Sequence, residues 1–195
     1  TLPKSITSIG YGCFYKTKLY GEVDLPNLSG TVAYGTFNGT QISKIKSLGT
    51  VSGFSGAGAS MGYPFQDCTA LTEISQSVWD NIISYDNSFQ GCTSLYIDEF
   101  RVPNLEKINP LGGGPRIRSR RDLGKITVLW GDTQLGSNNP AAYGTPSAVE
   151  EFFIPKTVTS IGRYAFNGLV NLNFIVSNPT TPPTLSSNAG LNSSN

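Results

Sequence analysis

A ten-residue unit, Phe65-Gln66-Asp67-Cys68-Thr69-Ala70-Leu71-Thr72-Glu73-Ile74, shows a pattern that recurs along the chain. It places an aromatic residue first, an apolar residue six positions later and another apolar residue three positions after that. The stretch that begins at Phe166 repeats this pattern in full, and the stretch at Phe89 repeats it with the last apolar residue one position early. Four further copies are looser or degenerate. The first positions of all the copies are Phe14, Phe37, Phe65, Phe89, Ile117, Tyr143 and Phe166.

The copies follow one another at a mean interval of about 25 residues, inside the range of leucine-rich repeats. A unit of this length cannot bury an apolar face alone, but stacked copies place each apolar column against its neighbours. Segments 71–74 and 172–176 are predicted strands, which would pair in parallel with their equivalents in adjacent turns. The Phe-x-x-Cys-x-x-Leu segment before the strand is predicted to form one helical turn on the opposite wall, because a spacing of three places these side chains on one helix face.

The sequence therefore predicts an α/β solenoid, mostly β and loop, built as a right-handed array of about seven leucine-rich-type repeats with short parallel strands and short helical turns. Residues 1–185 are expected to form this single solenoid, with degenerate repeats and insertions at 110–145, and residues 186–195 to form a polar tail. The glycine-rich runs at 53–60 and 112–115 are expected to be surface loops. The predicted core consists of the first positions of the copies together with Leu71, Leu95, Leu123 and Leu172.

Composition excludes several classes of protein. Charged residues make up 14% of the chain, and 14 Lys and Arg against 13 Asp and Glu leave a net charge of +1, which argues against a basic nucleic-acid binder. No apolar run approaches the roughly 18 residues of a membrane span, so this segment is not expected to insert into a membrane. The chain has no histidine, which excludes His-based triads and most zinc sites. No catalytic residue, metal or cofactor is predicted.

Several motifs carry a family resemblance. The segment Leu2-Pro3-Lys4-Ser5-Ile6-Thr7-Ser8-Ile9-Gly10 returns as Ile154-Pro155-Lys156-Thr157-Val158-Thr159-Ser160-Ile161-Gly162, and Gly91-Cys92-Thr93-Ser94-Leu95 follows an aromatic residue. Together they resemble the BspA-like leucine-rich repeat. The resemblance is strong at 2–24, 61–98 and 149–185 and weak at 110–145.

The resemblance implies a curved solenoid on the surface of host-associated bacteria, or secreted by them, that serves in binding and in some members in adhesion to host matrix. It implies no catalytic residues. The sequence departs from the family pattern at Arg116–Arg121, where a basic run replaces the usual aromatic-Gly-Cys turn. Because the chain begins inside a repeat, an export signal is expected upstream of Thr1.

Three hypotheses for function follow. The first is a non-catalytic cell-surface or secreted interaction module that binds a protein or glycan partner, host-derived or anionic, through the solenoid surface. The second is a structural spacer that presents another domain of a larger surface protein. The remote third is a carboxylate-based hydrolase. Glu150 and Glu151 are adjacent in the sequence, and adjacent strand residues point to opposite faces, so these two carboxylates are not expected to form a catalytic pair. The chain is expected to be a monomer.

The three cysteines allow two interpretations. Cys68 and Cys92 each lie three residues after the aromatic position, and Cys13 directly precedes Phe14. They could form a disulfide or a metal site, or they could be free thiols that fill small buried positions. The odd number and the repeat-locked positions favour buried, poorly reactive free thiols, although adjacent turns could bring Cys68 and Cys92 within bridging range.

A basic cluster is the one unusual surface feature. Seven of the fourteen basic residues lie between Arg101 and Lys125. Guanidinium groups suit sulfate, phosphate or carboxylate partners, whereas the alternative is a solvated loop that keeps a charge-poor surface soluble. The candidate anion-binding residues, on an expected loop, are Arg116, Arg118, Arg120, Arg121 and Lys125.

Charged residues also flank the predicted strands. They sit at a similar register in different copies, and opposite signs in neighbouring turns would form cross-strand ion pairs. Such pairs contribute only a few tenths of a kcal/mol each. The residues concerned are Glu22, Lys44, Glu73, Lys125 and Glu151.

Overall fold

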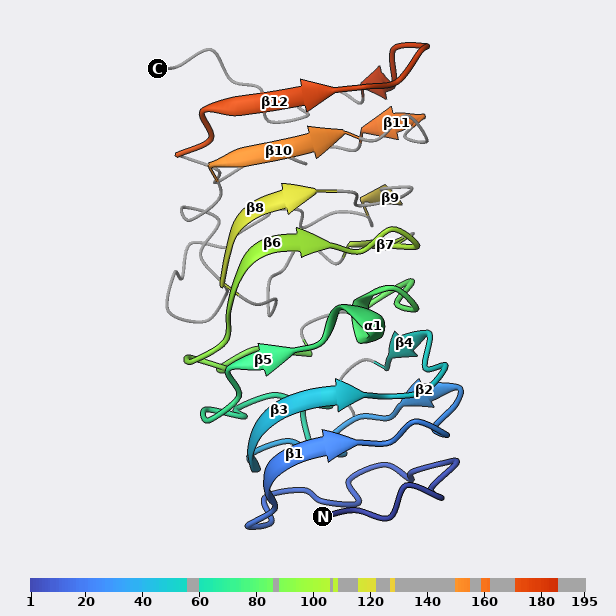
Figure 1. Cartoon of the computed structure of the whole chain (residues 1–195), viewed down its shortest axis with the longest axis vertical. Coiled ribbons are helices and arrows are strands. Elements are labelled where there is room, and N and C mark those ends of the chain that lie inside the picture. Colours follow the sequence, from blue (N-terminus) through green and yellow to red (C-terminus); the bar gives the residue numbers. More distant parts are fainter. Residues whose placement is uncertain are drawn as a thin grey trace.

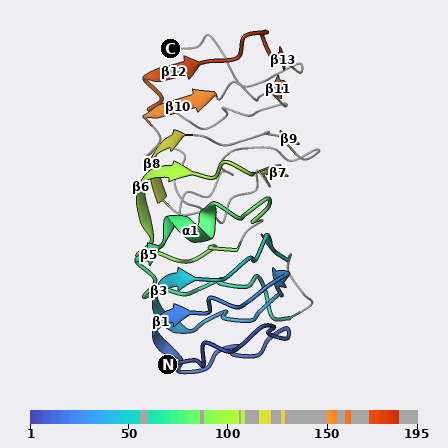
Figure 2. The same ribbon diagram turned by 45° about the vertical axis from the view of Figure 1, so that its right-hand side comes forward.

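The computed structural model describes residues 1–55, 60–85, 88–105, 107–108, 116–121, 127–128, 150–154, 159–161 and 171–185. Strands follow one another from the N-terminal to the C-terminal end as the steps of an elongated stack (Figure 1). One series of strands runs along one side of the stack and a second series of short strands along the other (Figure 2). Strand is abundant and helix nearly absent among these residues, which confirms a mostly β repeat structure.

Two parallel sheets are built from the strands of the first side, which have from two to seven residues. These strands are β1 (Tyr20–Asp24), β3 (Gln41–Ser47), β5 (Glu73–Ile74), β6 (Tyr96–Arg101), β8 (Arg116–Arg121), β10 (Glu151–Ile154) and β12 (Phe174–Ser177). The N-terminal sheet has the order β1-β3-β5 and the C-terminal sheet the order β12-β10-β8-β6. All of the pairs are parallel, as stacked copies of one unit require.

Shorter strands line the other side. They are β2 (Thr31–Val32), β4 (Gly53–Phe54), β7 (Lys107–Ile108), β9 (Thr127–Val128), β11 (Ser160–Ile161) and β13 (Thr184–Leu185). They pair in parallel as β2-β4, β7-β9 and β11-β13. The expected loop at 53–60 is therefore wrong at its start, because Gly53 and Phe54 are buried in β4, and residues 56–59 lie outside the described part.

Successive phenylalanines form a column through the described N-terminal half. Ring centroids are 5.4 Å apart between Phe14 and Phe37, 5.2 Å between Phe37 and Phe65 and 5.4 Å between Phe65 and Phe89, with stacked planes throughout. The last three rings are buried, whereas Phe14, at the end of the column, is partly buried. Offset stacking at 4.5–7 Å is the favourable geometry for such rings, so this column fixes the distance between turns.

The remaining predicted core positions divide into two groups. Leu71 and Leu95 are fully buried, and Leu172 is partly buried against the core. Leu123, Tyr143 and Phe166 lie outside the described residues, as does the side chain of Ile117.

Backbone hydrogen bonds join the turns around the phenylalanine column. Phe14 N donates to Thr36 O at 2.9 Å, and Phe37 N donates to Pro64 O at 2.7 Å. The same relation continues where Phe65 N donates to Ser88 O at 3.1 Å. The aromatic segments therefore form a parallel ladder of their own, separate from both series of strands.

The aromatic segment forms turns, so the helical turn expected between Phe65 and Leu71 is wrong. Cys68 N donates to Phe65 O at 3.3 Å and Leu71 N donates to Cys68 O at 3.1 Å, each closing a single turn. Asp67 lies between them with φ of 59°, a left-handed conformation that a right-handed helix cannot contain. The one helix among the described residues, α1 (Gln76–Trp79), follows β5 instead.

This left-handed corner recurs two positions after each aromatic residue. The φ angles there are 52° at Lys16, 69° at Gly39, 59° at Asp67 and 76° at Gly91. A Cβ atom added at Gly91 would collide with Oδ1 of Asp67 in the turn below. The backbone shape repeats more faithfully than the residue type, because the stacked turns impose it.

The strand ladder is interrupted between β5 and β6, which belong to different sheets. In Figure 1 these two strands lie visibly farther apart than paired neighbours, with α1 beside the gap. Side-chain amides bridge the interruption: Gln76 Nε2 donates to Arg101 O at 2.9 Å and Asn104 Nδ2 donates to Asp80 O at 2.6 Å. Below, this interruption is called the joint between the two sheets.

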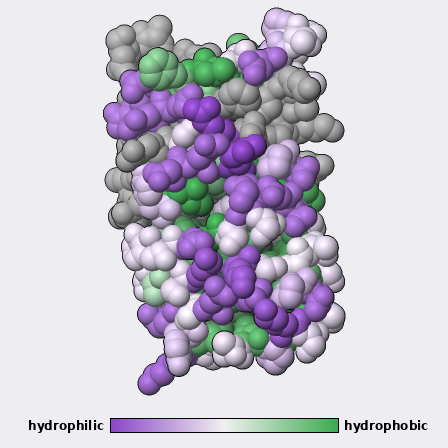
Figure 3. All heavy atoms as spheres, viewed as in Figure 1, coloured by the Kyte–Doolittle hydropathy of each residue, from purple (hydrophilic) through white to green (hydrophobic). Residues whose placement is uncertain are grey.

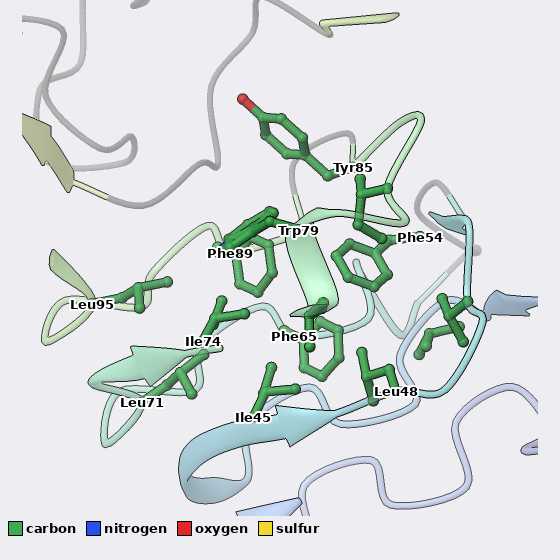
Figure 4. Close-up of a cluster of buried hydrophobic side chains, with 14 of the residues drawn as sticks. Ile45, Leu48, Phe54, Phe65, Leu71, Ile74, Trp79, Tyr85, Phe89 and Leu95 are labelled. Atoms are coloured by element: carbon green, nitrogen blue, oxygen red, sulfur yellow. The ribbon is translucent and has the colours of Figure 1, made fainter. Parts of the chain in front are cut away.

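Aromatic side chains fill the joint. Trp79 of α1 is buried, and its ring packs edge-on against Phe89 at 5.5 Å and against Phe100 of β6 at 4.9 Å between centroids. Figure 4 shows Trp79 beside Phe89 and above Phe65, so the helix joins the end of the phenylalanine column to the second sheet. Burial of these large rings replaces the missing strand pairing.

Two expectations about the basic run are wrong. Arg116–Arg121 is not a loop but strand β8, paired with β6 on one side and with β10 on the other. Ile117 does not occupy the aromatic position of a copy, because its backbone is in register with Ile97, eight residues after Phe89. With no aromatic residue to mark the turn, apolar spacing alone gave the wrong register.

We expect Phe65→Ala to lower the free energy of unfolding by about 3–5 kcal/mol, the usual cost of removing a large buried ring. Phe14→Ala should cost less, because among the described residues Phe14 stacks on the ring of Phe37 alone, and it is partly exposed. Urea unfolding followed by circular dichroism measures both losses. Equal losses for the two variants would contradict the column.

Candidate interaction surface

Charged columns cover the outer face of the N-terminal sheet. Glu22, Lys44 and Glu73 are in register on β1, β3 and β5, as expected from the repeat, and Lys44 Nζ lies 2.7 Å from Glu73 Oε1. Hydrophilic residues accordingly run up the middle of the view in Figure 3. Parallel pairing brings like positions side by side, and alternating sign makes that arrangement favourable.

A second group of charges lies at the end of β1. Asp24 accepts hydrogen bonds from Lys4 at 3.0 Å and from Lys46 at 3.2 Å. The hydrogen bond from Lys4, followed by that from Lys46, holds the pKa of Asp24 below its ordinary value. The hydrogen bond to Asp24 in turn raises the pKa of Lys46. These ion pairs are solvent-exposed and link the first turns of the stack.

The C-terminal sheet continues the pattern with arginine. Glu99, Ser119 and Glu151 are in register on β6, β8 and β10. Arg121 forms an ion pair with Glu151, and its Nε donates to Ser119 Oγ at 3.3 Å. The expectation that Lys125 shares the register of Glu151 is therefore wrong, since Ser119 holds that position; Lys125 itself lies outside the described residues.

Register distinguishes the arginines of β8 from one another. Arg120 pairs with Phe100 and with Phe152, both of which are buried. Arg121 instead pairs with Arg101, an exposed residue of β6. The side chains of Arg116, Arg118 and Arg120 lie outside the described part. The predicted arginines therefore lie on one strand, but Arg120 and Arg121 are in register with residues of different burial.

Exposed tyrosines were missed by the sequence analysis. Tyr20 is 80% exposed and Tyr96 42% exposed, and each directly follows the leucine of its repeat. Tyr11 stacks on Tyr34 with centroids 5.1 Å apart, and each lies three residues before its phenylalanine. Alignment of the copies on their phenylalanines reveals the pair of Tyr11 and Tyr34, whereas alignment on their leucines reveals the pair of Tyr20 and Tyr96.

The cysteines are free thiols in two different environments. Cys68 and Cys92 are buried, and their Sγ atoms donate to Phe37 O and Phe65 O, each at 3.1 Å. The neighbouring Cys68 thiol and burial raise the pKa of Cys92 well above its ordinary value. Cys13 is exposed, so the expectation that all three thiols are buried is wrong.

Metal ligation and a membrane-spanning helix have no structural basis in the described residues. No group of three or more Cys, Asp or Glu side chains there is placed to hold a metal ion. No helix in the described part is long and apolar enough to cross a membrane. The carboxylate of Glu151 is engaged by Arg121.

These parallel rungs, with leucines and phenylalanines in columns, define a leucine-rich repeat protein. The model of the BspA type leucine rich repeat region matches residues 1–110 and 139–193 in six copies. The chain belongs to this family, which is generally non-catalytic and typically found on bacterial surfaces or secreted. Neither a curated protein nor a solved structure matches the chain. The unmatched residues 111–138 include β8.

We expect a small thiol reagent to label Cys13 rapidly in the folded protein and to label Cys68 and Cys92 only on unfolding. Burial and a raised pKa leave Cys92 little reactive thiolate. Labelling followed by peptide mass spectrometry measures each site. Equal rates at all three sites would contradict the described burial.

Proposed function

We propose that this chain is a non-catalytic interaction module of a bacterial surface or secreted protein, and that its C-terminal sheet binds an anionic partner. A sulfated glycan is the simplest such partner, and an acidic protein segment offers the same chemistry. The family supports a surface repeat module. Extended repeat arrays present long, rigid faces on which such partners can lie.

One observation carries this proposal: a strand that contains four arginines, β8, lies inside the sheet rather than at its edge. Its neighbours β6 and β10 add Arg101 but only three acidic residues, so these strands are net basic. The guanidinium group presents several donors in a fixed plane that matches sulfate and carboxylate. A rigid strand would hold such groups in place better than the loop first expected.

The structural spacer remains the second candidate, and the N-terminal sheet favours it. The acidic and basic residues there are matched in ion pairs, such as Lys44 with Glu73 and Lys46 with Asp24. A face neutralised in this way offers little attraction to a charged ligand. We therefore assign partner binding to the C-terminal sheet and spacing to the N-terminal one.

The same proposal includes the architecture beyond the described rungs. We propose a monomeric, right-handed array of about seven repeats that spans residues 1–185 as one unit, followed by a tail at 186–195. The family model matches six copies, and strand β8 lies in the unmatched residues 111–138, where a seventh copy would fall; both support this count.

The test is salt-dependent elution from heparin. Arg116→Ser combined with Arg118→Ser removes two charges and leaves both the Arg121–Glu151 ion pair and Arg120 in place. We expect this variant to elute at lower salt than the unchanged chain, because screened attraction weakens with each lost charge.

The matched control combines Lys16→Ser with Lys18→Ser, which are exposed, have the same spacing and precede the N-terminal sheet. This variant should elute close to the unchanged chain. If both double variants elute together, overall charge rather than β8 determines retention, and the spacer interpretation replaces the binding one.

A further inference from the structure

We propose that Cys68 and Cys92 form a disulfide bond when the chain folds in the presence of a disulfide oxidant, and that this bond links the two sides of the joint between the two sheets. The two residues occupy the same position in consecutive turns, three residues after Phe65 and Phe89. Both are free and buried in the reduced structure.

The side chains of this column point the same way in each turn. Cys68 Sγ donates to Phe37 O, and Cys92 Sγ donates to Phe65 O, at the same distance of 3.1 Å. The two carbonyl groups belong to phenylalanines whose rings stack at 5.2 Å. The thiols are therefore related by a single step of the stack.

The preceding step of the column shows how close its side chains come. Thr40 occupies the equivalent position one turn earlier, and its Oγ1 lies 3.4 Å from Cys68 Sγ. The step from Phe65 to Phe89, 5.4 Å between centroids, closely matches the 5.2 Å step before it. Adjacent Cα atoms in such a ladder fall within the range that a disulfide spans.

The position of the pair gives the bond a consequence. Cys68 precedes β5 and Cys92 precedes β6, the two strands that do not pair. At this level the chain is held by the aromatic ladder, by Trp79 and by two side-chain amide bridges. A covalent link here would cross the joint and restrict separation of the two sheets.

The reaction requires a small-molecule disulfide as the oxidant, and oxidised glutathione is one such compound. One protein thiolate attacks a sulfur of oxidised glutathione, so that its S–S bond breaks and a mixed disulfide forms as one glutathione thiolate leaves. The second cysteine then attacks the protein sulfur, forming the intramolecular S–S bond and releasing the second glutathione. The two protein thiols lose two protons and two electrons, and the two glutathione molecules receive them.

The experiment uses the full chain with Cys13→Ser, which removes the exposed thiol. The reduced, unfolded protein is refolded in the presence of oxidised glutathione, then unfolded again, alkylated and cut with a Glu-specific protease, which separates the two cysteines at Glu73. We expect the Cys68 and Cys92 peptides to appear joined, with two hydrogens fewer than their sum and no alkyl group. The urea midpoint of the oxidised protein should also shift upward.

The matched controls are Cys68→Thr and Cys92→Thr in the same background, because threonine serves naturally at Thr40 in this column. In either variant the oxidant should leave the urea midpoint unchanged. The proposal is overturned if both thiols of the oxidised protein can still be alkylated after unfolding, or if either cysteine retains glutathione. If the disulfide forms but the urea midpoint of the oxidised protein is at or below that of the reduced protein, the claim that the bond stabilises the joint is wrong.

Discussion

Stacking of phenylalanine rings at 5.2–5.4 Å sets the rise per turn in the described N-terminal half. Main-chain hydrogen bonds from Phe37 and Phe65 to the following turns require the same rise, so the ring column and the backbone ladder reinforce each other. The left-handed corner two residues later follows from this constraint, because the chain must turn sharply while its amides point to the next turn. Even Asp67 adopts that corner, although glycine would do so with less strain.

This constraint explains how the chain continues where its main sheet does not. Between β5 and β6 the strands are unpaired, yet Phe65 still stacks on Phe89 and still donates to Ser88. Trp79 adds a large buried surface at the same level and connects the column to Phe100. The phenylalanine column and its backbone hydrogen bonds therefore continue the stack across the joint. The strands on the two sides of the joint differ in pairing and in charge.

Periodicity predicted much of this architecture, because a buried aromatic residue at a constant interval leaves a strong trace in the sequence. The parallel rungs and the register of Glu22, Lys44 and Glu73 follow from it directly. Where the aromatic residue is absent this signal is missing, so apolar spacing alone misplaces Ile117 and predicts a loop in place of β8. The sequence does not predict the joint, because the interval from Phe65 to Phe89 is close to the mean and only the pairing of the strands changes there.

The central claim is that the phenylalanine column and its backbone hydrogen bonds hold the two sheets together at the joint. Native-state hydrogen exchange of single amides tests it most directly, because Phe65 N and Asp67 N donate across the joint whereas Thr72 N and Ser75 N donate within the N-terminal sheet. The account predicts that the first pair exchanges as slowly as the second. Exchange of Phe65 and Asp67 at the rate of exposed loop amides, with Thr72 and Ser75 still protected, would contradict it.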